Sequence, residues 1–433
     1  MGSSAINLSG PLGPAQFRNK LINGDFNLWQ RGSSITTGPA AGAVGTVTTN
    51  RSYNADRWNL HARLGRGVSG GAVPGDGNAY ASVPRCTICR KGFTFGYPQL
   101  SDVSPSEYYT RVTIGAADGT NTNGVTGASM DLGNGIIEFS QLTDDNIHEF
   151  SNKTCHLSFL AKSYGDVINP TIGTNLSFDP DFSRGVNHHT VPDTTGTTAS
   201  FYHPVSLSRK RIKIVGDDVT VTPSWQKYKQ KFKLPDFTGC TLGTLPVIET
   251  SLILAAGASA PDELSGNISY TDLLALNGIT GAIDFAQIQL EIGDDVSDFE
   301  KRKSQVELEL CQRYYEKTYN VDTDLGTNTG YGGGIRGVTD PSINPTNHQP
   351  IQFEVRKRTA PSVTLYSKNG GAGQIYVVHA ETNNTTSQNA AAGGISESGI
   401  ARIDMVPDTN DLGDYSRGDT LIVFHYTADA EIG

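Results

Sequence analysis

The 433-residue chain has few charged residues, few cysteines and no long apolar run. The five cysteines are an odd number, which argues against a disulfide framework. No stretch of about 18 apolar residues occurs, so nothing predicts a membrane span. The net charge of −10 disfavours nucleic acid as the main partner. The opening MGSSAINLSGPLGPAQF lacks both a basic start and an apolar core, so we expect no secretory signal and synthesis in the cytoplasm of the producing cell.

Sequence signatures of catalysis are also missing. The chain has no G-x-S-x-G nucleophile turn, no H-E-x-x-H metal motif, no P-loop and no G-x-G-x-x-G after a strand. Carboxylate pairs for glycoside hydrolysis stay open, because their separation depends on the fold. We therefore expect a protein that is not an enzyme and that needs no cofactor for chemistry.

What the chain does have is glycine and short segments of alternating polarity. With 49 glycines and only 18% charged residues, it has the composition of an all-β protein with long loops. Residues 19–300 predict a large jelly-roll-like β-sandwich with loop insertions. Residues 1–18 have no periodic pattern and predict an extended anchoring arm. A connecting helix is expected at 301–320, and a smaller C-terminal β domain at 321–433.

The strand predicted from residue 283 onward alternates apolar and polar side chains. Gln287, Gln289 and Glu291 share the polar face, which alternation places opposite the core. Such a face can hydrogen-bond a sugar or a neighbouring chain, and an ordinary solvent face is the plain alternative.

The helix that follows is apolar around most of its circumference. Ser304 and Glu307 have capping-box spacing, which predicts the helix start. The apolar arc is wider than a surface helix needs, so we expect burial on two sides, against another domain or a neighbouring subunit. The predicted packing residues are Val306, Leu310, Cys311, Tyr314 and Tyr315.

A row of lysines alternates with apolar residues over residues 225–234. Because alternate residues of a strand lie about 6.6 Å apart, the row extends roughly 20 Å. In an acidic protein it can meet an anionic glycan, a phosphate-rich surface or an acidic partner subunit. The alternative is a solvated face whose lysines protect an edge strand from aggregation. The row and a second basic segment comprise Lys227, Lys229, Lys231, Lys233, Arg209, Arg211 and Lys213.

Several segments together resemble a family of tailed-bacteriophage virion proteins, the tail-fibre and appendage type with a carbohydrate-binding-like sandwich. They are NKLINGDFNLWQRG (19–32), YNADRWNL (53–60), FAQIQLEIGDDVSDFEKRKSQVELELCQRYYEKTY (285–319), RKRTAPSVTLYS (356–367) and VFHYTADAEIG (423–433). The resemblance implies a non-enzymatic structural protein of the phage particle, displayed on tail or head and often a homotrimer. In some related sandwiches a structural Ca²⁺ lies near the positions matched by Asn23, Asp25 and Asp284, and oxygen ligands suit that ion.

We therefore expect a bacteriophage appendage located in the virion, with other virion proteins and a host surface glycan as its partners. Two alternatives stay open. One is a capsid decoration or head-fibre protein with a purely structural role. The other is a glycan depolymerase, which is disfavoured because the long repeats typical of tailspike β-helices are not visible.

Overall fold

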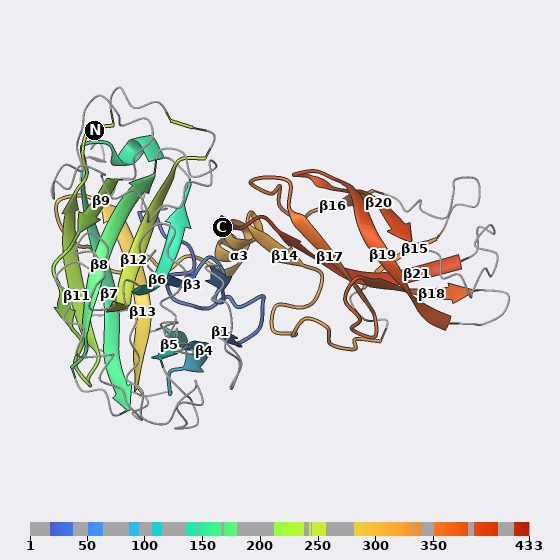
Figure 1. Cartoon of the computed structure of the whole chain (residues 1–433), viewed down its shortest axis with the longest axis horizontal. Coiled ribbons are helices and arrows are strands. Elements are labelled where there is room, and N and C mark those ends of the chain that lie inside the picture. The colour runs from blue at the N-terminus through green and yellow to red at the C-terminus, as the bar shows by residue number, and fades with distance from the viewer. Residues whose placement is uncertain are drawn as a thin grey trace, which may run out of the picture. The chain divides into compact units, whose positions relative to one another are not determined.

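The computed structural model describes residues 18–37, 51–63, 86–94, 106–114, 136–144, 147–165, 169–179, 212–237, 242–243, 245–256, 281–330, 332, 334–338, 350–379, 385–405 and 420–432. The chain divides into two compact units (Figure 1). The first comprises Met1–Phe26, Thr36–Ser52 and Trp58–Arg302, and the second comprises Asn27–Ile35, Tyr53–Arg57 and Lys303–Gly433. Residues 27–35 and 53–57, placed in the sandwich by the sequence analysis, are thus grouped with the C-terminal residues.

Two sheets form the first unit. The six-stranded sheet has the order β1 (Ser34–Thr37), β4 (Cys86–Gly92), β5 (Tyr108–Ile114), β13 (Gly281–Ile292), β7 (Thr154–Gly165) and β11 (Gln226–Lys233). The seven-stranded sheet has the order β10 (Val219–Thr220), β8 (Thr171–Asp179), β12 (Val247–Ala256), β6 (Ile136–Thr143), β3 (Asn59–Arg63) and β2 (Ser52–Tyr53), with β9 (Ile212–Val215) paired to β8. A short 3₁₀ helix, η1 (Ile147–Phe150), precedes β7.

Aromatic side chains pack the two sheets face to face. The ring of Phe139 on β6 lies 6.0 Å from that of Phe285 on β13, and Phe159 on β7 lies 6.2 Å from Phe285. All three side chains are buried. Alternating inward residues of two sheets that meet in this way make a sandwich core. The predicted all-β sandwich is therefore confirmed.

The second unit contains α3 (Ser304–Gln312) and β14 (Tyr315–Lys317). Its sheet has the order β14, β21 (Thr420–Asp429), β18 (Gln374–His379), β19 (Thr385–Ile395), β20 (Gly399–Met405) and β16 (Ile351–Gln352), and β15 (Ile335–Val338) and β17 (Ser362–Ser367) also pair with β21. Leu365, Ile375, Val377 and Phe424 belong to its buried core. Within the described residues, no helix has the length and apolar character needed to cross a bilayer.

The helix is shorter than the prediction of 301–320. Its N-cap is Lys303, and Ser304 is its first helical residue. The predicted capping box from Ser304 to Glu307 is therefore wrong, and the Lys303 side chain makes no capping hydrogen bond. The chain leaves the helix after Gln312 and pairs as a strand with β21, where Tyr315 lies opposite Asp429. Ladder hydrogen bonds to the last strand replace the helical ones, a tertiary effect that helix periodicity does not reveal.

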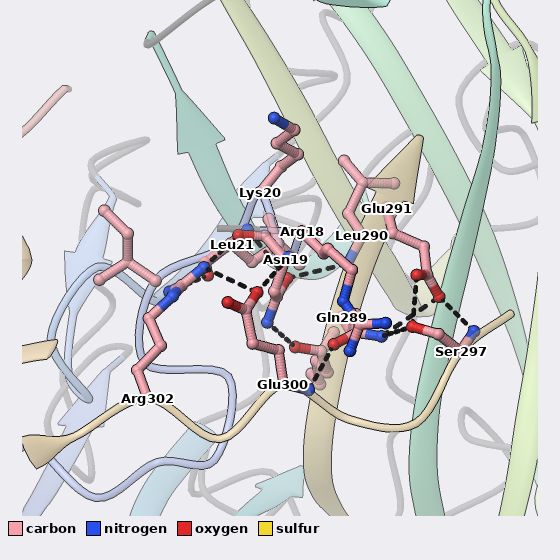
Figure 2. Close-up of polar contacts among 12 residues, drawn as sticks. Arg18, Asn19, Lys20, Leu21, Gln289, Leu290, Glu291, Ser297, Glu300 and Arg302 are labelled. Carbon is pink, nitrogen blue, oxygen red and sulfur yellow. Dashed lines mark hydrogen bonds and ion pairs between the residues drawn. The ribbon is translucent and has the colours of Figure 1, made fainter. Parts of the chain in front are cut away.

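The N-terminal segment of the first unit completes β13 (Figure 2). β5 pairs with β13 only from Gly281 to Phe285, whereas β7 pairs as far as Ile292. Beyond β5, Lys20 donates its backbone N–H to the Leu290 carbonyl at 2.7 Å, and the Ile288 N–H donates to the Gly24 carbonyl at 2.9 Å. A side chain at position 24 would lie 2.1 Å from the Ile288 oxygen, so only glycine allows this approach.

Candidate functional site

The outward side of the six-stranded sheet carries a transverse row of charges. Asp284 on β13 lies opposite Arg111 on β5 and opposite Lys162 on β7. Arg111 donates from Nε and Nη2 to the two Asp284 oxygens at 2.7 and 2.9 Å, and Lys162 Nζ lies 3.6 Å from the same carboxylate. The carboxylate is fully buried, whereas both cations are partly open to solvent. Burial opposes the charged form of Arg111, but bonding and charge from Asp284 outweigh it and raise the pKa of Arg111.

Aromatic rings surround this row. Phe93, Tyr109 and Trp225 form a cluster with centroid separations of 4.9 to 5.4 Å, and Lys162 Nζ lies 5.3 Å from the Trp225 ring. The Arg111 guanidinium lies 3.6 Å from the centroid of Tyr164, which is 53% exposed. Cations over ring faces are attracted by the ring quadrupole. The result is an aromatic surface, partly exposed, with its cations held in place.

The predicted lysine row borders these rings on the same side of the sheet. Lys227 lies opposite Leu160, which packs against Trp225. Lys229, Lys231 and Lys233 are exposed and Lys227 is half-buried, while the alternating Phe232 is buried. β11 is the edge strand, so these lysines also suit the protective role. We name the outward surface formed by Lys91, Phe93, Tyr109, Arg111, Lys162, Tyr164, Trp225, Lys227, Lys229, Lys231 and Lys233 the basic-aromatic face.

Other members of the predicted basic set are not placed here. Arg209 and Arg211 lie outside the described residues, and of Lys213 only the backbone, in β9, is described. β9 pairs with β8 of the seven-stranded sheet, whereas β11 belongs to the six-stranded one. Lys213 and the lysines of β11 therefore lie on different sheets.

Gln287, Gln289 and Glu291 do not form an open face, and that prediction is wrong. Their side chains are 4%, 0% and 5% exposed. The residues after β13 fold back over two of them, so that Gln289 accepts from the Glu300 N–H at 2.8 Å, and Glu291 accepts from the Ser297 hydroxyl at 2.6 Å (Figure 2). Gln287 instead donates to the Ser106 hydroxyl at 2.7 Å. Gln289 and Glu291 hold the turn after β13 in place, and all three buried groups are unavailable to a glycan.

Asn19 makes the matching connection from the N-terminal segment (Figure 2). Its Oδ1 accepts from the N–H groups of Leu21 and Leu290 at 3.0 and 3.1 Å, and its Nδ2 donates to the Ile288 carbonyl at 3.2 Å. Arg302 donates to the carbonyls of Asn19 and Leu21. We call this arrangement of residues 19–24, β13 and residues 297–302 the N-terminal clasp.

The residues of the expected calcium site have other roles in this fold. Asp284 is paired with Arg111 and Lys162, whose charges oppose a cation at that carboxylate. Asn23 is buried with φ of 56°, and its carbonyl accepts from the Trp58 indole at 3.0 Å. Asp25 is also buried. No group of three or more His, Cys, Asp or Glu suited to a metal occurs in the described part of the chain. The expected calcium at Asn23 and Asp25 stays a prediction.

The predicted packing residues lie in the second unit with different degrees of burial. Val306 and Leu310 are half-buried, whereas Cys311, Tyr314 and Tyr315 are buried. Tyr314 and Tyr315 follow the helix, and the charged groups that cover them come from segments distant in sequence. The Arg57 guanidinium lies 3.3 Å from the Tyr314 ring centroid, and that of Arg31 lies 3.6 Å from the Tyr315 ring centroid. No neighbouring subunit is needed to bury these rings.

Carboxylates of the same unit neutralise the two arginines. Arg31 lies 3.2 Å from Asp429, 3.4 Å from Glu431 and 3.8 Å from Asp56, and Arg57 pairs with Glu431. Burial raises the pKa of Asp56 to about 6, against the lowering effect of Arg31. The side chains of these pairs are buried except for that of Asp429, so the cluster offers no open site.

Sequence reasoning missed the residues that lie between the strands of the basic-aromatic face. Tyr109 and Arg111 alternate in YYTRVTI (108–114), and Lys162 and Tyr164 alternate near the end of β7. Each pair predicts a strand face with one ring and one cation. The sequence does not show that β13 places Asp284 between them.

Comparisons with known proteins find only distant structural similarities. No family model and no curated protein sequence matches the chain. Among solved structures, a protein described as "CBM4 structure and function" is 14% identical, with 48% of this chain and 87% of that chain covered and a TM-score of 0.21. The N-terminal cellulose-binding domain of Cellulomonas fimi beta-1,4-glucanase C is 8% identical, with 48% and 90% covered and a TM-score of 0.23. A cyclase from Fischerella sp. TAU is 11% identical, with 61% and 100% covered and a TM-score of 0.25. Likenesses this distant do not bear on function.

Proposed function

We propose that the protein is a non-enzymatic virion protein of a tailed bacteriophage, of the tail-fibre or appendage type, whose sandwich contacts a host surface glycan. The segment resemblance supports the phage assignment. The basic-aromatic face carries the glycan assignment, because an exposed ring, Tyr164, lies against the cation Arg111, which a buried carboxylate fixes. Rings give sugars a flat apolar surface, and polar groups in fixed positions give orientation.

The assembly part of the proposal rests on the resemblance alone. The protein acts as a homo-oligomer, a trimer by resemblance, and residues 1–18 anchor it to other virion proteins. Of that arm, only Arg18 lies within the described residues. Immunogold labelling of particles with antibody against the second unit tests the location. Gold on the tail supports an appendage, whereas gold over the head supports the capsid-decoration alternative.

Glycan binding is tested with the purified full chain on an array of bacterial capsular polysaccharides, lipopolysaccharide O-chains and teichoic acids. We expect binding that Tyr164→Ala weakens roughly tenfold, since hot-spot rings are worth about 1.4 kcal/mol or more. Val215→Ala is the matched control, because Val215 is an exposed apolar residue, 42% exposed, on the seven-stranded sheet. Absence of binding to every glycan would refute glycan contact, and release of reducing ends would support the depolymerase alternative.

A further inference from the structure

The cations of the first unit's six-stranded sheet gather on its outward side. Lys91 on β4 lies opposite Tyr109 on β5, and Tyr109 contacts Trp225 and lies 5.9 Å from Lys162 Nζ. Arg111 and Lys162 occupy the middle strands, and the exposed lysines of β11 occupy the edge. Positive charge thus extends across the sheet from β4 to β11 and along β11, a strand with a length of roughly 25 Å at about 3.3 Å per residue.

Among the described residues, the acidic side chains on the central strand β13 of this face are buried, and the exposed ones, Glu107, Asp294, Asp295 and Asp298, lie outside the strands, just before β5 and in the turn after β13. Asp284, the acidic residue between Arg111 and Lys162, is fully buried beneath them. Glu291, further along β13, is buried and accepts from Ser297. The chain as a whole has a net charge of −10, so this positive face stands out against an acidic protein. Local charge of one sign attracts a ligand of the other sign.

We infer that the ligand of the basic-aromatic face is a polyanionic glycan, with carboxylate or phosphate groups repeating along the chain. This inference rests on the proposed function and gives its substrate class. The exposed lysines bind the acidic groups, and Tyr164 with the half-buried Tyr109 and Phe93 contacts the sugar rings. Arg111 and Lys162 link these areas, because Asp284 holds both cations at the boundary between rings and lysines.

The combination of rings and cations favours a glycan over an acidic protein surface. A protein partner would be expected to bring an apolar centre to the contact, with charges at its rim. Here the apolar component consists of ring faces packed with cations, as with Arg111 over Tyr164 and Lys162 beside Trp225. Duplex DNA is the other polyanion to consider, and it is included as a competitor in the test.

The test measures binding of the full chain to immobilised polygalacturonate and to wall teichoic acid, with neutral dextran as reference, at 50 to 300 mM salt. The two anionic probes separate carboxylate from phosphate recognition. The site variant is Lys229→Gln with Lys231→Gln, and its charge-matched control is Lys301→Gln with Lys303→Gln. All four lysines are exposed.

We expect at least one anionic glycan to bind, with affinity that falls with salt. The affinity of the site variant should be roughly tenfold weaker than that of the unchanged protein, and it should depend less steeply on salt, because about two ionic contacts are removed. The affinity of the control variant should stay within about twofold of that of the unchanged protein. Equal loss in both variants, or stronger competition by duplex DNA than by the soluble glycan, overturns the inference. Binding of dextran alone, weakened by Tyr164→Ala, overturns the anionic class but leaves glycan contact standing. Binding of no glycan refutes both.

Discussion

Removal of the Asn19 side chain should destabilise the first unit strongly. The side chain is 3% exposed and satisfies two backbone N–H groups and one carbonyl on both sides of the N-terminal clasp. Asn19→Ala leaves those buried groups without this partner. Each group that water does not reach lowers the free energy of unfolding by about 1 to 3 kcal/mol. Because the surrounding residues relax in part, we expect the free energy of unfolding to fall by about 3 kcal/mol in total.

The assay is urea unfolding followed by tryptophan fluorescence. Trp58 reports on the clasp, because its indole donates to the Asn23 carbonyl at 3.0 Å. Gln226→Ala is the control, since Gln226 is exposed on β11 and should change stability by less than about 0.5 kcal/mol. A loss below about 1 kcal/mol for Asn19→Ala, or a loss equal to that of the control, would refute the assignment of the clasp as a main support of β13.

Three further changes test other parts of the fold. Gly24→Ala should destabilise by about 1 to 3 kcal/mol, because the added carbon meets backbone, whereas Gly92→Ala, with 4.0 Å of room, should be near neutral in the same urea assay. Lys357 donates to Glu316 at 2.6 Å with its side chain fully buried, so Lys357→Met should cost about 3 to 5 kcal/mol. Adding Glu316→Gln should recover part of that loss in thermal denaturation, and no recovery would contradict the pairing. Burial lowers the pKa of His425 from 6.5, so the folded state resists its protonation and stability falls as pH drops below about 6.5. His425→Gln should show a weaker fall in melting temperature from pH 7.5 to 5.5, and an unchanged fall would contradict this origin.

Alternation of apolar and polar residues predicted the strands and the lysine row of the basic-aromatic face. Residues 225–234 were expected to place lysines outward, and in β11 Lys229 is exposed while Phe232 is buried. The same rule failed at Gln289, because alternation distinguishes two sides of a strand but not what covers each side. There the turn after β13 returns with Ser297 and Glu300 to cover the polar side. A polar strand face covered by a polar turn has the same sequence pattern as one that faces water.

The helix prediction failed for a related reason. The pattern from Val306 to Tyr319 fits one continuous helix, but Tyr315 can form either structure, and β21 offers it a strand partner. Aromatic residues favour strands when an edge is available. The end of α3 is therefore decided by residues more than a hundred positions away, which no local pattern contains.

The segments that carry the family resemblance are used mainly to hold each unit together. Asn19 and Gln289 build the N-terminal clasp, and Arg31, Asp56 and Glu431 build the buried charged cluster of the second unit. Groups that are buried and partnered in this way leave nothing exposed for recognition. Tyr164 and Lys229, two exposed members of the basic-aromatic face, lie outside the matched segments. Under the proposed function, we expect a protein that kept the matched segments and changed the basic-aromatic face to keep the fold and to change its ligand.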